Sequence, residues 1–236
     1  MLLAVHLGWE RVYQLFALVS LSYPVVLWHL LKRAAPSEAT TQENTRSALD
    51  ASRITLGLLA FLVLYRLSDN LIGAMINPFL IQAGYALETI ALYGKLCVTI
   101  GTMVGSVLGG YLMRYYGVDK MLIVFGFAHA PVHLMYILLH GADTPLLIAT
   151  SVLESITSGM TMSAYIALMT QHSLGKYSTT KYSLLGSTMG FSRSTLPSIS
   201  GFLVNYLGWD WFFVINSLLI FPAVLLFKLH IKGNQR

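Results

Sequence analysis

Long apolar stretches recur along the sequence, separated by short polar segments, and this pattern decides what the chain can fold into. Each stretch has about 20 residues, the length at which an α-helix crosses a hydrocarbon core of roughly 30 Å. Only 25 of the 236 side chains are charged, 15 basic and 10 acidic, and 56% of the residues are hydrophobic. This composition excludes a soluble enzyme, a nucleic-acid-binding protein and a disordered protein. We predict an all-α integral membrane protein.

About seven transmembrane helices are predicted when the apolar windows are divided at polar residues and at glycine and proline clusters. The connections are short except for residues 32–53, whose polar and mixed-charge composition is typical of a flexible linker. The N-terminal residues contain no basic cluster, and no small-residue cleavage site follows the first span, so we expect a membrane anchor there and not a secretory signal. The predicted spans are 12–31, 54–81, 89–113, 121–139, 145–170, 182–206 and 212–230.

Lysine and arginine are distributed unequally between the two sides of the predicted membrane protein. Eleven of the 15 lie in alternate connections and after the last span, whereas Arg11 alone lies on the other side. The remaining three, Arg66, Lys95 and Arg193, lie within spans. Because basic residues concentrate in cytoplasmic loops, this bias places the C-terminus in the cytoplasm and the N-terminus outside. The excess of positive charge therefore reflects topology, and no nucleic-acid partner is expected.

A short motif occurs twice, 200 residues apart, and each copy precedes an apolar span. The two copies are Leu7-Gly8-Trp9-Glu10 and Leu207-Gly208-Trp209-Asp210. Parallel repeats of six spans are the internal plan of major facilitator transporters. On that plan, residues 1–31 contain the last helix of an otherwise absent N-terminal half, residues 32–53 are the cytoplasmic linker, and residues 54–236 form a complete C-terminal six-helix bundle.

Several polar segments within and between the spans resemble segments of the AmpG-type muropeptide permeases of the major facilitator superfamily. The resemblance is carried by residues 64–70 (LYRLSDN), 100–110 (IGTMVGSVLGG), 164–169 (AYIALM) and 177–185 (YSTTKYSLL). It implies a proton-driven importer of anhydro-muropeptides, the disaccharide-peptide products of cell-wall turnover. It also implies a bacterial inner membrane location, with the N-terminus in the periplasm. The expected partners are the lipid bilayer, an anionic muropeptide-like substrate, and either a separately encoded N-terminal half or a second copy of the chain.

Five ionisable side chains lie within the spans, where a charge costs roughly 2.5–3.5 kcal/mol at the bilayer centre and usually has a partner. Arg66 and Asp69 are three residues apart, so they share a helix face and form either a local ion pair or a substrate contact. Arg193 lies before Pro197 and has a structural or a substrate role. The resemblance to a transporter of anionic cargo favours Arg66, Lys95 and Arg193 as substrate-binding residues. For Lys95 the alternative is an ammonium group that extends to the outer interface of the membrane.

Two acidic side chains are the candidates for proton coupling, Asp69 and Glu154. Glu154 has no partner in its own span and is interpreted either as a proton carrier or as the partner of Arg193 or Lys95. His129 and His133 are four residues apart on one helix face, a spacing that suits metal ligands. No acid or cysteine in the same span completes such a site, so no metal site, no cofactor and no enzymatic activity are predicted.

The glycines at positions 101, 105 and 109 form a stripe on one helix face, which predicts close packing against a neighbouring helix. Two rival functions stay open at this point. One is a truncated or split-gene relic without transport activity of its own. The other is a permease of the same superfamily for a different anionic cargo, such as acetyl-CoA.

Overall fold

Long helices account for nearly all of the part of the chain that the structure describes. The computed structural model describes residues 56–139, 143–175 and 177–231, together with all their side chains except those of 93–95, 230 and 231. The predicted first span, 12–31, and the predicted linker, 32–53, lie outside the described residues. The helices are α4 (Leu56–Gln82), α5 (Leu87–Tyr116), α6 (Val118–Met135), α7 (Thr144–Ser173), α8 (Ser178–Thr195), α9 (Ser200–Leu218) and α10 (Ile220–Leu226), with short helical turns at Tyr136–Leu138, Leu196–Ile199 and Phe227–Ile231.

The six predicted spans after residue 53 all coincide with helices, and no strand occurs among the described residues. Four continuous helical segments are long and apolar enough to cross a membrane: Leu56–Gln82, Leu87–Tyr116, Val118–Leu138 and Ser178–Leu229. The last of them has 52 residues, but Gly208 interrupts it with φ 79° and ψ 172°. The chain therefore turns at Gly208, between the last two predicted spans, and this segment crosses the membrane twice. The chain is a multi-pass, all-α membrane protein.

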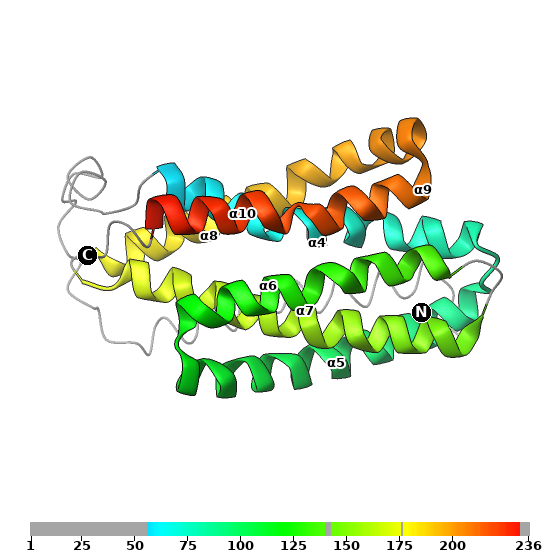
Figure 1. The fold of residues 1–236 in the computed structure, drawn as a ribbon, viewed down its shortest axis with the longest axis horizontal. Coiled ribbons are helices and arrows are strands. Elements are labelled where there is room, and N and C mark those ends of the chain that lie inside the picture. The colour runs from blue at the N-terminus through cyan, green and yellow to red at the C-terminus, as the bar shows by residue number, and fades with distance from the viewer. Residues whose placement is uncertain (1–55, 140–142, 176, 232–236) are drawn as a thin grey trace, which may run out of the picture. The chain divides into compact units, whose positions relative to one another are not determined.

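The helices run roughly along one axis and form two groups (Figure 1). In one group, α5 and α6 pack on α7; in the other, α8, α9 and α10 pack on α4. The groups meet where α6 contacts α9 and α7 contacts α8. The central polar residues of α4, α6 and α7 lie along this seam.

The α5–α7 contact depends on the predicted glycine stripe. A β-carbon at Gly101 would lie 2.6 Å from that of Ser155, and β-carbons at Gly105 and Gly109 would overlap Ile156 and Ser163. Real β-carbons do not approach other atoms so closely, so only glycine permits this helix separation. The prediction that the stripe packs against a neighbouring helix is confirmed, and α7 is that neighbour.

Two separate apolar cores stabilise the two ends of the bundle. The first contains Phe61 near the beginning of α4, Phe125 in the middle of α6 and Tyr165 in the second half of α7. The second contains Phe79 and Phe213 and draws on the opposite ends of the same bundle. Between the two cores, buried polar side chains collect around Ser68 of α4 and around His129 and His133 of α6.

Candidate functional site

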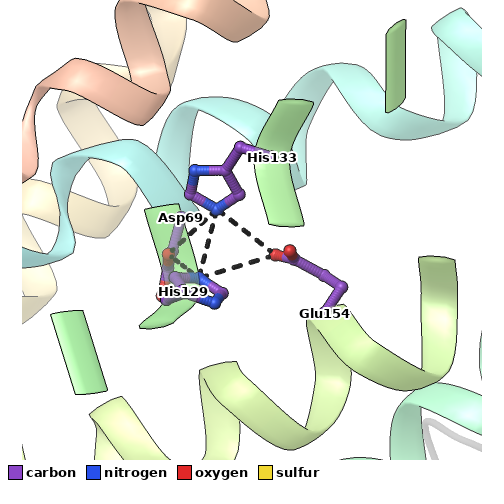
Figure 2. A group of neighbouring side chains, drawn as sticks. All are labelled: Asp69, His129, His133 and Glu154. Atoms are coloured by element: carbon purple, nitrogen blue, oxygen red, sulfur yellow. Dashed lines mark hydrogen bonds and ion pairs between the residues drawn. The ribbon is translucent and has the colours of Figure 1, made fainter. Parts of the chain in front are cut away.

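Four ionisable side chains from three helices meet in the middle of the bundle. Asp69 comes from α4, His129 and His133 from α6, and Glu154 from α7 (Figure 2). Asp69 is the central residue of α4, with thirteen helical residues on either side. The side chains are 10%, 6%, 2% and 16% exposed, respectively. Burial of this degree excludes bulk water, so these groups satisfy or repel one another directly.

The rings of His129 and His133 face each other through their Nε2 atoms. Their spacing of four places both on one face of α6, and the rings meet edge to face with centroids 4.4 Å apart. Their Nε2 atoms are 3.1 Å apart. Asp69 Oδ1 lies 2.7 Å from the His129 Nε2 and 3.8 Å from the His133 Nε2. Glu154 Oε1 lies 3.7 and 3.6 Å from the same two nitrogens.

The opposite ring nitrogens each contact a hydroxyl group. His129 Nδ1 lies 2.6 Å from Thr157 Oγ1, and His133 Nδ1 lies 3.0 Å from Ser68 Oγ. The Thr157 hydroxyl donates to Leu153 O (2.8 Å), and the Ser68 hydroxyl donates to Asn216 O (2.9 Å). Because a hydroxyl has one proton, both oxygens accept from the imidazoles. We therefore assign the proton of each ring to Nδ1.

Arg66 borders this cluster on the same face of α4. Its guanidinium forms an ion pair with Asp69 Oδ2 and donates to Thr161 Oγ1 of α7 at 3.3 Å. The local ion pair predicted from the three-residue spacing is thus confirmed. The guanidinium is only 15% exposed, so the pair holds Asp69 in place within a largely dry environment.

The structure brings together three of the five predicted site residues, Arg66, Asp69 and Glu154. Arg193 is exposed in the last turn of α8 and lies outside the cluster. The side chain of Lys95 lies outside the described part of the molecule. Among the described residues, the partners found for Glu154 are the two histidines, not Arg193.

The sequence did not predict that His129 and His133 belong to a group of ionisable residues, because their own span contains no acid or cysteine that would join them. The acids that join them come from α4 and α7, and one ligand atom from each of the four residues lies within 4.8 Å of the others. The spacing of four was the available signal. These four side chains are able to hold a cation, whether protons or a metal ion. A cavity lined by Tyr65, Ser68, Asp69, His129, His133 and Asn216 adjoins them.

Comparison with known proteins identifies relatives over most of the sequence. The family model of the Major Facilitator Superfamily matches residues 58–235. A transporter named AmpG 1 from Rickettsia prowazekii is 43% identical over 80% of this chain and 43% of its own length. The Rickettsia bellii AmpG 1 is 36% identical over 99% of this chain and 61% of its own length. An AmpG 4 transporter from Rickettsia conorii is 34% identical over 75% and 44%, respectively. The chain therefore spans about two fifths to three fifths of these relatives, and the resemblance to AmpG-type permeases is confirmed.

Proposed function

The chain belongs to the major facilitator superfamily, a family of secondary transporters, and we propose that it supplies the C-terminal six-helix half of a proton-coupled importer of anhydro-muropeptides. The main support for this proposal is the sequence similarity to transporters named AmpG, which in one case extends over 99% of the chain. On this proposal, residues 54–236 are the C-terminal half, residues 1–31 hold the last helix of the other half, and residues 32–53 connect them.

The substrate is proposed to bind through basic side chains. Muropeptides carry carboxylates, and a cation held in a low-dielectric environment attracts them more strongly than it would in water. Arg193 and Lys95 are the proposed contacts on α8 and α5. Arg66 is the third, and its bond to Thr161 and its pair with Asp69 fix the direction of the guanidinium.

The coupling proton is proposed to bind at Asp69 or Glu154. Both are buried acids midway between the two apolar cores of the bundle, and both adjoin the histidine pair. Transporters of this superfamily bind substrate near the bilayer midplane, between two halves that rock against each other. A proton carrier at this depth is well placed to link its own occupancy to that motion.

A second six-helix unit is the proposed partner, because the substrate site of such a transporter lies between two halves. That unit is either a separately encoded N-terminal half or a second copy of this chain. The proposed location is the bacterial inner membrane. The lysine and arginine distribution supports a cytoplasmic C-terminus and a periplasmic N-terminus.

The test is uptake of labelled anhydro-muropeptide into liposomes that contain the 236-residue chain, under a proton gradient of importing polarity. Parallel liposomes contain the chain together with a separately made N-terminal half. Uptake that exceeds that of empty liposomes, and that a protonophore abolishes, is the expected result for at least one preparation. Unlabelled acetyl-CoA is the competitor that separates the two cargoes: competition by it, and none by muropeptide, would contradict the proposed substrate. Absence of uptake from both folded preparations would contradict the proposed activity.

A further inference from the structure

Four atoms of the histidine–carboxylate cluster face one another, and a single proton cannot form hydrogen bonds with all of them. Each imidazole directs its Nδ1–H outward to a hydroxyl, so in its neutral form it presents a lone pair at Nε2. These two lone pairs and the oxygens Asp69 Oδ1 and Glu154 Oε1 all converge on one point. Four acceptors thus face one another across distances of 2.7–3.8 Å. One proton lies between only two atoms, so it leaves the others without a donor.

The carboxylate of Glu154 is not satisfied by hydrogen bonds from the other residues of the cluster. The contacts of its Oε1 with the two Nε2 atoms, at 3.6 and 3.7 Å, are longer than a hydrogen bond. Its Oε2 is buried and has no hydrogen-bond partner among the described residues. A buried carboxylate with so few hydrogen bonds is costly, and a cation bound at its Oε1 would neutralise its charge.

The separations of the four atoms match those of ligands around one metal ion. Zn²⁺ binds nitrogen and oxygen at about 2.0–2.1 Å, and a tetrahedron of such bonds places its ligand atoms about 3.4 Å apart. Five of the six distances within the cluster are 2.7, 3.1, 3.6, 3.7 and 3.8 Å, on both sides of that value, and the sixth, between the two carboxylates, is within 4.8 Å. The four side chains point toward one another from three helices (Figure 2).

The surroundings of the histidines also suit metal ligation. Ligating imidazoles usually donate their other ring N–H to an oxygen, which fixes the tautomer and the ring orientation. Thr157 and Ser68 accept those bonds here, and each hydroxyl is itself anchored to a backbone carbonyl. Both Nε2 lone pairs are thereby directed inward. Arg66 holds Asp69 from the outside through the other carboxylate oxygen.

We propose that Asp69, His129, His133 and Glu154 bind one divalent transition-metal ion, with Zn²⁺ as the best fit. The ligand atoms are the two Nε2 atoms, Asp69 Oδ1 and Glu154 Oε1. Two imidazoles select a transition metal over Mg²⁺ and Ca²⁺, which prefer oxygen ligands alone. The bound ion joins α4 to α6 and α7 across the seam between the two helix groups. It occupies the same carboxylates as the proposed coupling proton, so the two cations exclude each other at this site.

The test measures metal binding by the full chain, purified with a tag that contains no histidine and freed of metal with a chelator. Zn²⁺ is titrated by calorimetry, and Co²⁺ serves as a spectroscopic probe because its visible absorption is intense in tetrahedral sites. The expected result is one metal ion per chain, a tetrahedral Co²⁺ spectrum and no comparable binding of Mg²⁺. Absence of binding by folded protein, or an octahedral Co²⁺ spectrum, would overturn the proposal.

Variants locate the metal within the chain. His133→Gln removes one ligand and is expected to weaken Zn²⁺ binding at least 100-fold. His172→Gln is the matched control, because His172 lies near the end of α7, outside the cluster, and contacts Leu168 O instead. Equal binding by wild type and His133→Gln would show that the metal binds elsewhere and would overturn the proposal.

A milder variant keeps the test decisive if the ligand variants do not fold. Thr157→Val removes the acceptor of His129 Nδ1–H and leaves all four ligands in place. Loss of such an outer contact typically weakens metal binding 10- to 100-fold, whereas Thr157→Ser, which keeps the hydroxyl, is expected to bind within about twofold of wild type. Equal affinities for the valine and serine variants would refute the assigned ligand set. All these readouts are independent of transport, so they are separate from the test of the proposed function.

Discussion

Gly105 of α5 lies directly against the backbone carbonyl of Ile156 on α7, with no space for a β-carbon between them. The contact is reciprocal, because Gly159 of α7 lies equally close to the backbone of Thr102 on α5. Such close backbone approaches strengthen van der Waals packing, which contributes much of the stability of helix pairs in a bilayer. Close van der Waals packing therefore stabilises the pair α5–α7, whereas ion pairs and hydrogen bonds stabilise the histidine–carboxylate cluster.

Gly105→Ala is expected to destabilise the protein, because the new methyl group forces the two helices apart. Overpacking of this kind costs about 1–3 kcal/mol. The matched control is Gly110→Ala on the same helix, where a β-carbon would meet no atom within 4 Å. Thermal unfolding in detergent should show a lower Tm for the first variant and an unchanged or higher Tm for the second. Equal Tm values for the two would contradict the packing account.

Gly208→Ala is expected to destabilise the turn within α9 through the backbone alone. With φ 79° and ψ 172°, this residue occupies a region that is almost restricted to glycine, and occupancy by another residue costs about 1–3 kcal/mol. Nothing lies within 4 Å of the position of a β-carbon there, so steric overlap does not contribute.

Gly201→Ala, at a helical position of the same element, is the control for the Gly208 variant. A β-carbon at Gly201 would make only an ordinary contact with Met75, at 3.8 Å. Limited proteolysis around residue 208, together with the Tm, distinguishes the two variants. A Gly208 variant as stable and as protease-resistant as the Gly201 variant would show that the turn does not require glycine.

Asp69→Asn is expected to lower stability by about 3–5 kcal/mol, because removal of one partner leaves the Arg66 guanidinium buried without a counter-charge. The double variant Arg66→Gln with Asp69→Asn removes both charges and is expected to recover part of that loss. A double-mutant cycle measured by thermal unfolding in chelator gives the coupling between them, and chelator removes any contribution of bound metal. A coupling free energy near zero would mean that the ion pair is not stabilising.

Arg193→Gln is expected to reduce muropeptide uptake without affecting stability, since the side chain is exposed on α8. Loss of one contact between a cation and a carboxylate should raise the KM about tenfold, which corresponds to about 1.4 kcal/mol. Lys181→Gln, near the beginning of the same helix, is the control. If both variants transport like wild type, Arg193 does not bind the substrate.

Much of the fold could be predicted from the sequence, because spans, turns and glycine stripes are local features. Apolar windows located the helices, the gap between the last two predicted spans contains the turn at Gly208, and the spacing of positions 66 and 69 gave an ion pair as one of two expected roles. These patterns depend on helix periodicity, which backbone geometry fixes, and on membrane thickness, which the lipid bilayer sets.

The composition of the cluster could not be predicted in the same way, because it depends on which helices are neighbours. Glu154 was expected either to carry a proton or to have Arg193 or Lys95 as its partner, yet His129 and His133 are its neighbours in the structure. A spacing of four shows that two histidines share a face, and it gives no information about which helix that face contacts. The acids that join them lie 60 residues before His129 and 21 residues after His133 in the sequence.

The four residues of the cluster come from both helix groups, so the cluster connects the two groups as well as offering a place for a cation. Asp69 belongs to the group around α4, while Glu154 belongs to α7, which the glycine stripe binds rigidly to α5. A sliding or tilting of one group against the other changes the separation of these two carboxylates. A cation binds most tightly at one separation, so its binding and that arrangement of the two groups stabilise each other equally. With a cation bound as proposed, the cluster would convert the concentration of a small ion into a preference for one relative position of the two helix groups.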